Sequence, residues 1–255
     1  MPELNSRRFL LLLLCAAWVT IDAAVLSWHA LQMQLASDSR ITQPLILGLM
    51  FGQFATAAGW LALGDDAWLR RLTVAAVVLL GFPAAIHFSD GYFPLSDFLV
   101  IGAIQFLIVL LPLLGLRAYG ISLRSESTPH VARWQFTLLE ILALTTLVAL
   151  ALAYLRNVSW DARAVPYGFA LVLIGSTVGA GWTMWPLVFW ASRAWAIAGI
   201  VGWIVVGGIS AAAFMTAFPW AALFGALQPI VLAISVGVIR IAGYELGRSR
   251  ESLAK

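Results

Sequence analysis

The sequence predicts an all-α bundle of about eight transmembrane helices, and three observations lead to this prediction. Hydrophobic residues make up 62% of the 255 residues and charged residues 11%, whereas soluble domains average roughly one half and one quarter. The charged residues gather at the ends of apolar runs of about 20 residues, which is the length that crosses a bilayer as a helix. The alternation of an outer-membrane β-strand is absent from these runs.

The eight runs can be assigned in order because charged or turn-forming residues separate them. The first run follows Arg7 and Arg8. It continues beyond the length of a secretory signal core and lacks a convincing cleavage site, so we expect it to remain as a span. The predicted spans are Phe9–Leu31, Gln43–Leu63, Leu72–Phe88, Asp97–Leu116, Phe136–Leu155, Val165–Trp190, Ala194–Phe218 and Ala221–Ala242. The third span is the shortest.

Basic residues predict the orientation, because cytosolic ends of spans are rich in arginine and lysine. With eight spans and a cytosolic N-terminus, 12 of the 15 basic residues fall on the cytosolic side. The outer side then holds Arg40, Arg156 and Arg163. We therefore expect a protein of the bacterial cytoplasmic (inner) membrane with both termini in the cytosol. A basic stripe interleaved with aromatic residues is absent, so we expect no nucleic-acid partner.

The chain contains an internal repeat. A shift of 122 residues aligns the second and sixth spans, which share the pattern Pro-x13-Ala-Gly-Trp-x7-Trp-x2-Arg, and a shift of 123 aligns the fourth and eighth. The matched pairs include Trp60 with Trp182, Gln105 with Gln228 and Arg117 with Arg240. Duplication predicts two parallel four-helix units, 1–120 and 133–255, joined by a cytosolic linker at 121–132. Chance similarity in an alanine- and leucine-rich chain is the alternative.

Residues 133–155, RWQFTLLEILALTTLVALALAYL, carry a family resemblance. They are similar to a segment of uncharacterised planctomycete membrane proteins that reads R-x-Q-F-S/T-L, a charged residue, and a leucine-rich run containing TLVA. Glu140 stands near the position where a basic residue is usual. The resemblance implies a bacterial inner membrane and no particular activity.

Gln105 and Gln228 are the first candidate substrate-binding residues. Both lie near the middle of the membrane, where a lone amide is costly and should face the bundle. Pro112 and Pro229 lie in the same spans, and a proline inside a helix frees a carbonyl. Amides and freed carbonyls could line a polar cavity between the repeats. The alternative is an ordinary hydrogen bond between helices.

Asp22 is the third candidate substrate-binding residue, because a carboxylate inside a span is a candidate for proton or cation handling. Burial in the membrane favours its neutral, protonated form. Thr20 or His29 could contact it. The alternative is a protonated aspartate that hydrogen-bonds to a neighbouring helix. The second repeat has Val148 in its place, so the feature is not shared between the copies.

Catalytic chemistry has little support in the sequence. His87, Asp90 and Asp97 lie near the predicted outer face, but their spacing is not typical of a metal site. The motifs HExxH, GxSxG, GxGxxG after a strand and the Walker A loop are absent. Cys15 is the single cysteine, which excludes an intramolecular disulfide and a thiolate cluster. We therefore expect no catalytic residue, no metal and no cofactor.

Two function classes remain in addition to a lipid-modifying enzyme built on the His87 region. The first is a small permease or exporter with an unidentified small-molecule substrate and a polar site between the repeats. The second is a non-catalytic membrane subunit or scaffold. It would form a homodimer or bind a membrane partner through glycine-rich helix faces such as Gly48–Gly52 and Gly175–Gly179.

Overall fold

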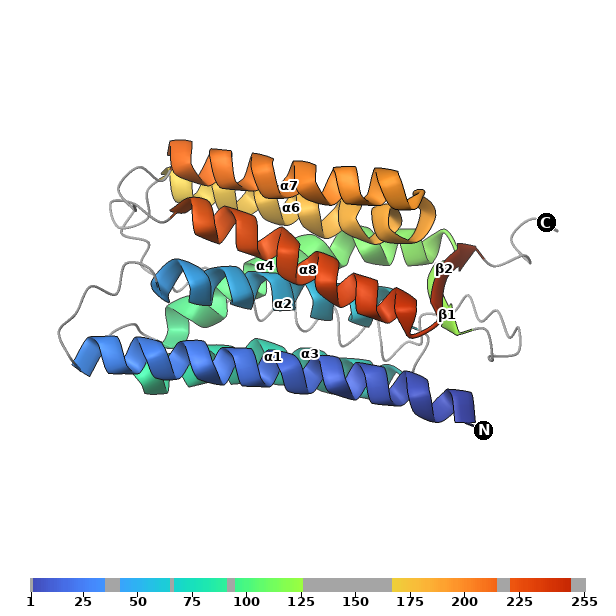
Figure 1. Ribbon diagram of the computed structural model, residues 1–255, viewed down its shortest axis with the longest axis horizontal. Coiled ribbons are helices and arrows are strands. Elements are labelled where there is room, and N and C mark those ends of the chain that lie inside the picture. Colours follow the sequence, from blue (N-terminus) through green and yellow to red (C-terminus); the bar gives the residue numbers. More distant parts are fainter. Residues whose placement is uncertain are drawn as a thin grey trace.

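The structure, a computed structural model, describes residues 2–34, 42–64, 67–90, 95–125, 167–214 and 221–248. Within these ranges the chain forms seven helices and one two-stranded sheet (Figure 1). The helices are α1 (Pro2–Gln34), α2 (Thr42–Leu63), α3 (Trp68–Asp90), α4 (Leu95–Ala118), α6 (Tyr167–Trp190), α7 (Arg193–Phe214) and α8 (Ala221–Ile241). The strands are β1 (Ile121–Ser125) and β2 (Tyr244–Arg248).

These helices confirm the prediction of an all-α, multi-pass membrane protein. Six of the described helices are long and apolar enough to cross a membrane. The predicted third span is longer than the sequence indicated, because α3 has 23 residues. The predicted fifth span, Phe136–Leu155, lies outside the described residues. The number of eight spans and the division into two repeats stay predictions.

Helix α2 is the centre of the bundle. It packs against α1, α3, α4, α6 and α8, and its residues Phe51, Phe54 and Ala58 have no exposed surface. Helices α1 and α3 form one side of the bundle and α6 and α7 the other (Figure 1). Large apolar side chains point outward from both sides, such as Val19 of α1 and Trp195 of α7, which are 67% and 73% exposed. Lipid tails are as apolar as a core, so these side chains lose nothing by facing outward.

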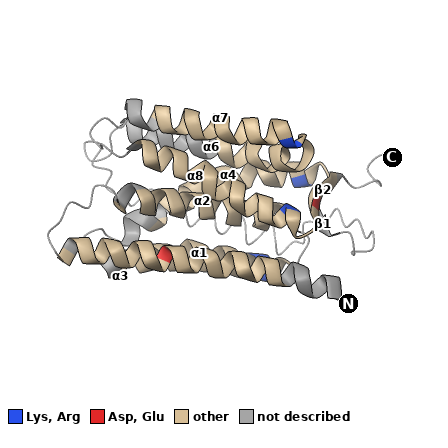
Figure 2. Cartoon of the chain, in the orientation of Figure 1, with Lys and Arg blue, Asp and Glu red and all other residues tan. Residues whose placement is uncertain are grey.

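The basic residues of the described chain gather toward the end of the bundle that carries the sheet (Figure 2). At this end Arg71 donates to the carbonyl of Leu61 at 2.5 Å, and Arg117 donates to Ala62 and Gly64 at 2.9 and 3.0 Å. The carbonyls of Leu61 and Ala62 lie in the last turn of α2 and that of Gly64 directly follows it, where backbone acceptors lack partners within the helix. That this end faces the cytosol stays a prediction from the positive-inside rule.

The sheet is the feature that the sequence analysis missed. Strands β1 and β2 pair antiparallel, and Leu123 lies opposite Leu246 at the centre of the ladder. Each strand follows a glycine with a positive φ angle, 80° at Gly120 and 82° at Gly243. A positive φ is inexpensive only for glycine, so these two residues allow the chain to leave α4 and α8 and enter the strands. Strand β1 therefore occupies the beginning of the segment predicted to be a linker.

Candidate functional site

The middle of α2 joins the three residues predicted to bind a substrate. Three consecutive positions of this helix each contact a different neighbouring helix, so residues from α1, α4 and α8 meet at one level of the bundle. Phe51 contacts Gln105 of α4, Gly52 lies against Gln228 of α8, and Gln53 contacts Asp22 of α1.

Asp22 pairs with Gln53. The amide nitrogen of Gln53 lies 2.8 and 2.9 Å from the two carboxylate oxygens of Asp22 and donates to them. Asp22 is half-buried and Gln53 is 9% exposed. The predicted contacts of Asp22 with Thr20 or His29 are not the ones observed. Thr20 donates to the carbonyl of Ala16 in its own helix, and the ring of His29 contacts the hydroxyl of Thr42.

One face of α1 carries the polar contacts of this helix with the bundle. The indole of Trp18 donates to Ser235 of α8 at 3.1 Å, and His29 lies 2.7 Å from the hydroxyl of Thr42 at the start of α2. Thr42 also donates to Gln32 at 3.1 Å. Trp18, His29 and Gln32 are spaced from Asp22 by four, seven and ten residues. At about 3.6 residues per turn, all four side chains lie on one side of α1. A polar seam therefore runs along the contact of α1 with α2 and α8.

Gln105 and Gln228 are both fully buried, with no exposed surface. Gln105 donates its amide nitrogen to the carbonyl of Phe51 at 2.9 Å, while its amide oxygen has no partner among the described residues. A Cβ on Gly52 would lie 2.5 Å from the Cβ of Val231 and 3.1 Å from the backbone carbonyl oxygen of Gln228, so only glycine allows α2 and α8 to approach this closely. In this arrangement a substrate would reach either amide only if the helices separated.

The carbonyls freed by Pro112 and Pro229 lie at helix contacts. Pro112 removes the N–H that would bond to Ile108, four residues earlier, and the indole of Trp182 donates to that carbonyl at 3.0 Å. Pro229 likewise frees the carbonyl of Gly225, which lies against Gly207 of α7. Trp182, predicted as the repeat partner of Trp60, therefore joins α6 to α4 through a proline-freed carbonyl.

The other repeat pairs lie near the sheet. Arg240 donates to the carbonyl of Val188 at the end of α6. Arg117 likewise donates to the carbonyls of Ala62 and Gly64 at the end of α2. Trp60 contacts the ring of Tyr244 edge to face, with centroids 5.3 Å apart and planes at 75°. Both arginines therefore stabilise the end of a neighbouring helix, and Trp60 packs against β2.

The glycine faces predicted to bind a partner are covered by helices of the same chain. Gly48 lies against Leu227 of α8, and Gly179 lies against Trp203 of α7. In the described part of the chain, no group of three or more His, Cys, Asp or Glu side chains could hold a metal ion. The side chains of Asp90 and Asp97 lie outside that part.

Comparison with protein-family models, with curated proteins and with solved structures gives no match for this chain. Residues 133–155, which carry the resemblance to planctomycete membrane proteins, lie outside the described residues. That resemblance therefore stays a prediction.

Proposed function

We propose that the protein is a small permease or exporter of the cytoplasmic membrane, with Asp22 and Gln53 as its polar site. The observation that carries this proposal is the pairing of a carboxylate with an amide between two membrane-spanning helices. An ionisable group at this depth is expensive, and such groups commonly mark paths for protons, cations or polar substrates. A carboxylate selects protons, cations or hydrogen-bond donors.

Helix α1 is suited to be the element that moves. Most of its spanning segment is exposed, whereas most of the spanning segment of α2 is buried. Its polar contacts with the bundle are the few hydrogen bonds along the seam, and a hydrogen bond between membrane helices contributes about 1 kcal/mol or less. Separation of α1 from α2 would therefore cost little and would expose Asp22 to a substrate.

We further propose that the bundle arose by tandem duplication of a four-helix unit. Three features of the structure support this proposal because they recur 123 residues apart. They are the arginines that bond to the end of a neighbouring helix (Arg117 and Arg240), the positive-φ glycines (Gly120 and Gly243), and the strands β1 and β2. The antiparallel pairing of β1 with β2 supports a two-fold axis between the copies.

A second candidate function, a non-catalytic membrane subunit, is favoured by the burial of both repeat glutamines. Neither Gln105 nor Gln228 has exposed surface, as a purely structural role requires. Such a subunit would act through outward-facing side chains, of which Trp195, Ile197 and Ile209 on α7 are more than 60% exposed.

Water access to the seam tests the permease proposal. Single cysteines would replace Val25 and Leu26 on the seam, or Ile21 and Trp28 on the outward face, in a Cys15→Ala background because Cys15 is exposed. A membrane-impermeant thiol reagent would be applied from each side. We expect labelling at the seam positions and none at the outward positions. Absence of labelling at all four positions from both sides would favour the non-catalytic subunit.

Proton movement provides a functional readout that does not require knowledge of the substrate. The purified chain would be reconstituted into liposomes that contain a pH-sensitive dye, and an imposed membrane potential would drive the flux. We expect a flux in the wild type that Asp22→Asn removes. The matched control is Thr20→Val, two residues away, whose hydroxyl bonds only within α1. A flux equal in all three proteins would exclude Asp22 from a proton path.

A further inference from the structure

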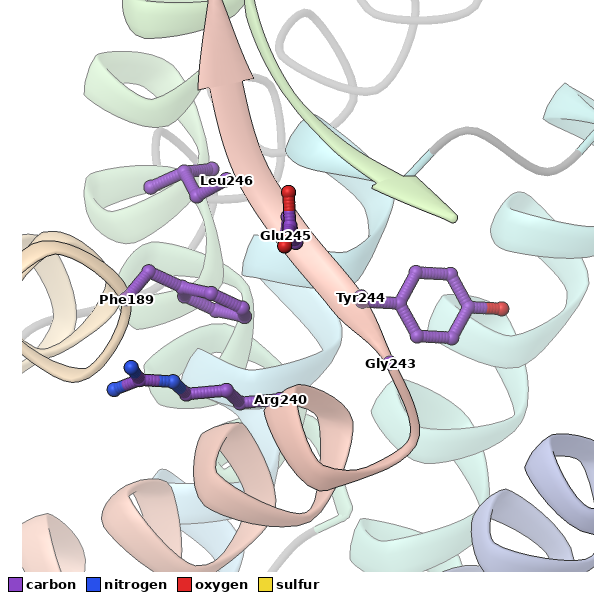
Figure 3. Close-up of a pocket in the computed structure, with 6 residues that line it drawn as sticks. All are labelled: Phe189, Arg240, Gly243, Tyr244, Glu245 and Leu246. Atoms are coloured by element: carbon purple, nitrogen blue, oxygen red, sulfur yellow. The ribbon is translucent and has the colours of Figure 1, made fainter. Parts of the chain in front are cut away.

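A pocket of about 420 Å³ lies at the arginine-rich end of the bundle. It is formed where the last residues of α6, the last turn of α8 and the beginning of β2 meet, and it is lined by Phe189, Arg240, Gly243, Tyr244, Glu245 and Leu246 (Figure 3). Its volume lies within the range of roughly 300–1,000 Å³ that small-molecule sites occupy.

The pocket presents one positive and one negative side chain. Arg240 and Glu245 are both exposed, and among the described residues no ion pair joins them. The guanidinium of Arg240 donates one hydrogen bond to the carbonyl of Val188, which holds the side chain beside α6. A guanidinium has five N–H donors, so several remain for an anion. A ligand with an anionic and a cationic group would satisfy both side chains.

Phe189 and Leu246 are the apolar residues of the lining, but most of the accessible surface of the pocket is polar. The ring of Phe189 lies between Leu246 and the side chain of Arg240 (Figure 3), and it stacks on Trp185 with centroids 6.4 Å apart and planes at 8°. Leu246 is 6% exposed. Tyr244 points to the opposite side of β2, toward Trp60. The exposed lining is therefore polar and charged, which suits a lipid headgroup and not an acyl chain.

The depth of the pocket matches that of phospholipid headgroups. The apolar window of α8 ends at Ile241, one residue after Arg240, so the guanidinium lies at the boundary of the span. The indole of Trp190 donates to the carbonyl of Leu246 at 2.8 Å, and this ring is 55% exposed. Tryptophans are enriched at the membrane–water interface, where one edge is apolar and the other is hydrated.

We propose that this pocket binds the headgroup of a zwitterionic aminophospholipid of the cytosolic leaflet, with its phosphate at Arg240 and its ammonium group at Glu245. The glycine at position 243 makes this arrangement possible. Its φ of 82° turns the chain out of α8 so that Glu245 returns to the same pocket as Arg240. An anionic phospholipid lacks the ammonium group and would place a second negative charge near Glu245, so the site should discriminate against it.

Retention of lipids by the purified full-length chain tests the proposal. The protein would be equilibrated with equal amounts of short-chain phosphatidylethanolamine and phosphatidylglycerol in detergent, and the bound lipids would be counted by native mass spectrometry. We expect at least a tenfold preference for phosphatidylethanolamine. Arg240→Gln should reduce binding of both lipids, and Glu245→Gln should remove the preference by admitting phosphatidylglycerol. Equal retention of both lipids by the wild type would overturn the proposal.

Two controls make the result specific. Arg193→Gln removes the same charge from an exposed position at the same end of the bundle, outside the pocket, and should leave the preference unchanged. An equal loss in this variant would overturn the proposal by showing a general charge effect. Glu245→Gln covers the case in which Arg240→Gln fails to fold, since Arg240 also bonds to α6. Free phosphoethanolamine that competes as well as the lipid would overturn the assignment to a membrane lipid.

Discussion

Leu123 and Leu246 lie directly opposite each other at the centre of the β1–β2 ladder, and they are 123 residues apart in the sequence. The same offset separates the glycines that precede the two strands. In an antiparallel pair, a two-fold axis passes between two strands at their central residues. Equivalent residues of the two strands are therefore paired about a local two-fold axis, as expected for symmetric copies. The pairing also joins the segment after α4 to the segment after α8 by hydrogen bonds.

The first prediction concerns the two glycines that enter the strands. Gly120→Ala and Gly243→Ala force a side chain into a left-handed conformation, so each should lower the free energy of unfolding by about 1–2 kcal/mol. Two similar losses are expected because the φ angles are 80° and 82°. The measurement is denaturant unfolding in detergent. Gly115→Ala is the control, since its Cβ would meet nothing within 4 Å. A loss at only one of the two glycines would contradict the equivalence of the strands.

The six described helices that are long and apolar enough to span a membrane could be predicted from the sequence, whereas the sheet could not. A span is specified locally, by about 20 consecutive apolar residues between charges, and α2 begins one residue before its predicted start and ends at its predicted end, Leu63. The sheet depends on two five-residue segments that pair across more than 100 residues. Neither segment alone carries a strand signal, so the recurrence of Arg-x-x-Gly at positions 117–120 and 240–243 was the only local indication.

The site was predictable in part. Asp22 could be identified because a carboxylate in an apolar run is conspicuous, but its partner Gln53 was missed. Gln53 lies in a different helix, and the pairing depends on how α1 leans on α2, which the sequence does not specify. The signal that could have revealed it is depth. Both residues lie near the middle of adjacent spans, where a polar group requires a polar partner.

The second prediction tests the pairing of Trp182 with the carbonyl freed by Pro112. Trp182→Phe keeps an aromatic ring but removes the N–H that reaches Ile108. It should lower the free energy of unfolding by about 1–2 kcal/mol, the cost of leaving a carbonyl without a partner. Pro112→Ala restores the backbone N–H that bonds to Ile108 within α4. In that background we expect Trp182→Phe to cost clearly less, and equal costs in both backgrounds would contradict the assignment.

The third prediction is a double-mutant cycle between Asp22 and Gln53. Asp22→Leu and Gln53→Met should each destabilise the protein because each leaves the other polar side chain without its partner, and the double mutant should lose less than the sum of the two. The expected coupling is about 0.6–1.7 kcal/mol, the range for hydrogen bonds between membrane helices. Thermal unfolding in one detergent provides the measurement. The hydroxyl of Thr20 bonds within α1, so Thr20→Val combined with Gln53→Met should be additive. Additivity of Asp22→Leu with Gln53→Met would show that the pair contributes nothing to the seam.

The fourth prediction separates the two roles of Gln105. Its amide nitrogen gains a bond to Phe51, while its amide oxygen is buried without a partner among the described residues. A buried polar atom without a partner costs about 1–3 kcal/mol, and a hydrogen bond contributes about 1 kcal/mol. Gln105→Leu removes both the hydrogen bond to Phe51 and the unpartnered amide oxygen, and it keeps a similar side-chain volume. The free energy of unfolding should therefore stay the same or increase. The carbonyl of Phe51 belongs to a helix and keeps its backbone bond.

The same variant bears on function. If Gln105 only packs α4 against α2, Gln105→Leu should leave the proton flux in liposomes at the wild-type level. If the amide oxygen instead receives a substrate or water when the helices part, the flux should fall although the protein is no less stable. Gln105→Glu is the complementary variant, because it retains the shape and the acceptor but loses the N–H that reaches Phe51. A stable Gln105→Leu protein with reduced flux would move the proposed path from the α1 seam toward the contact of α4 with α2.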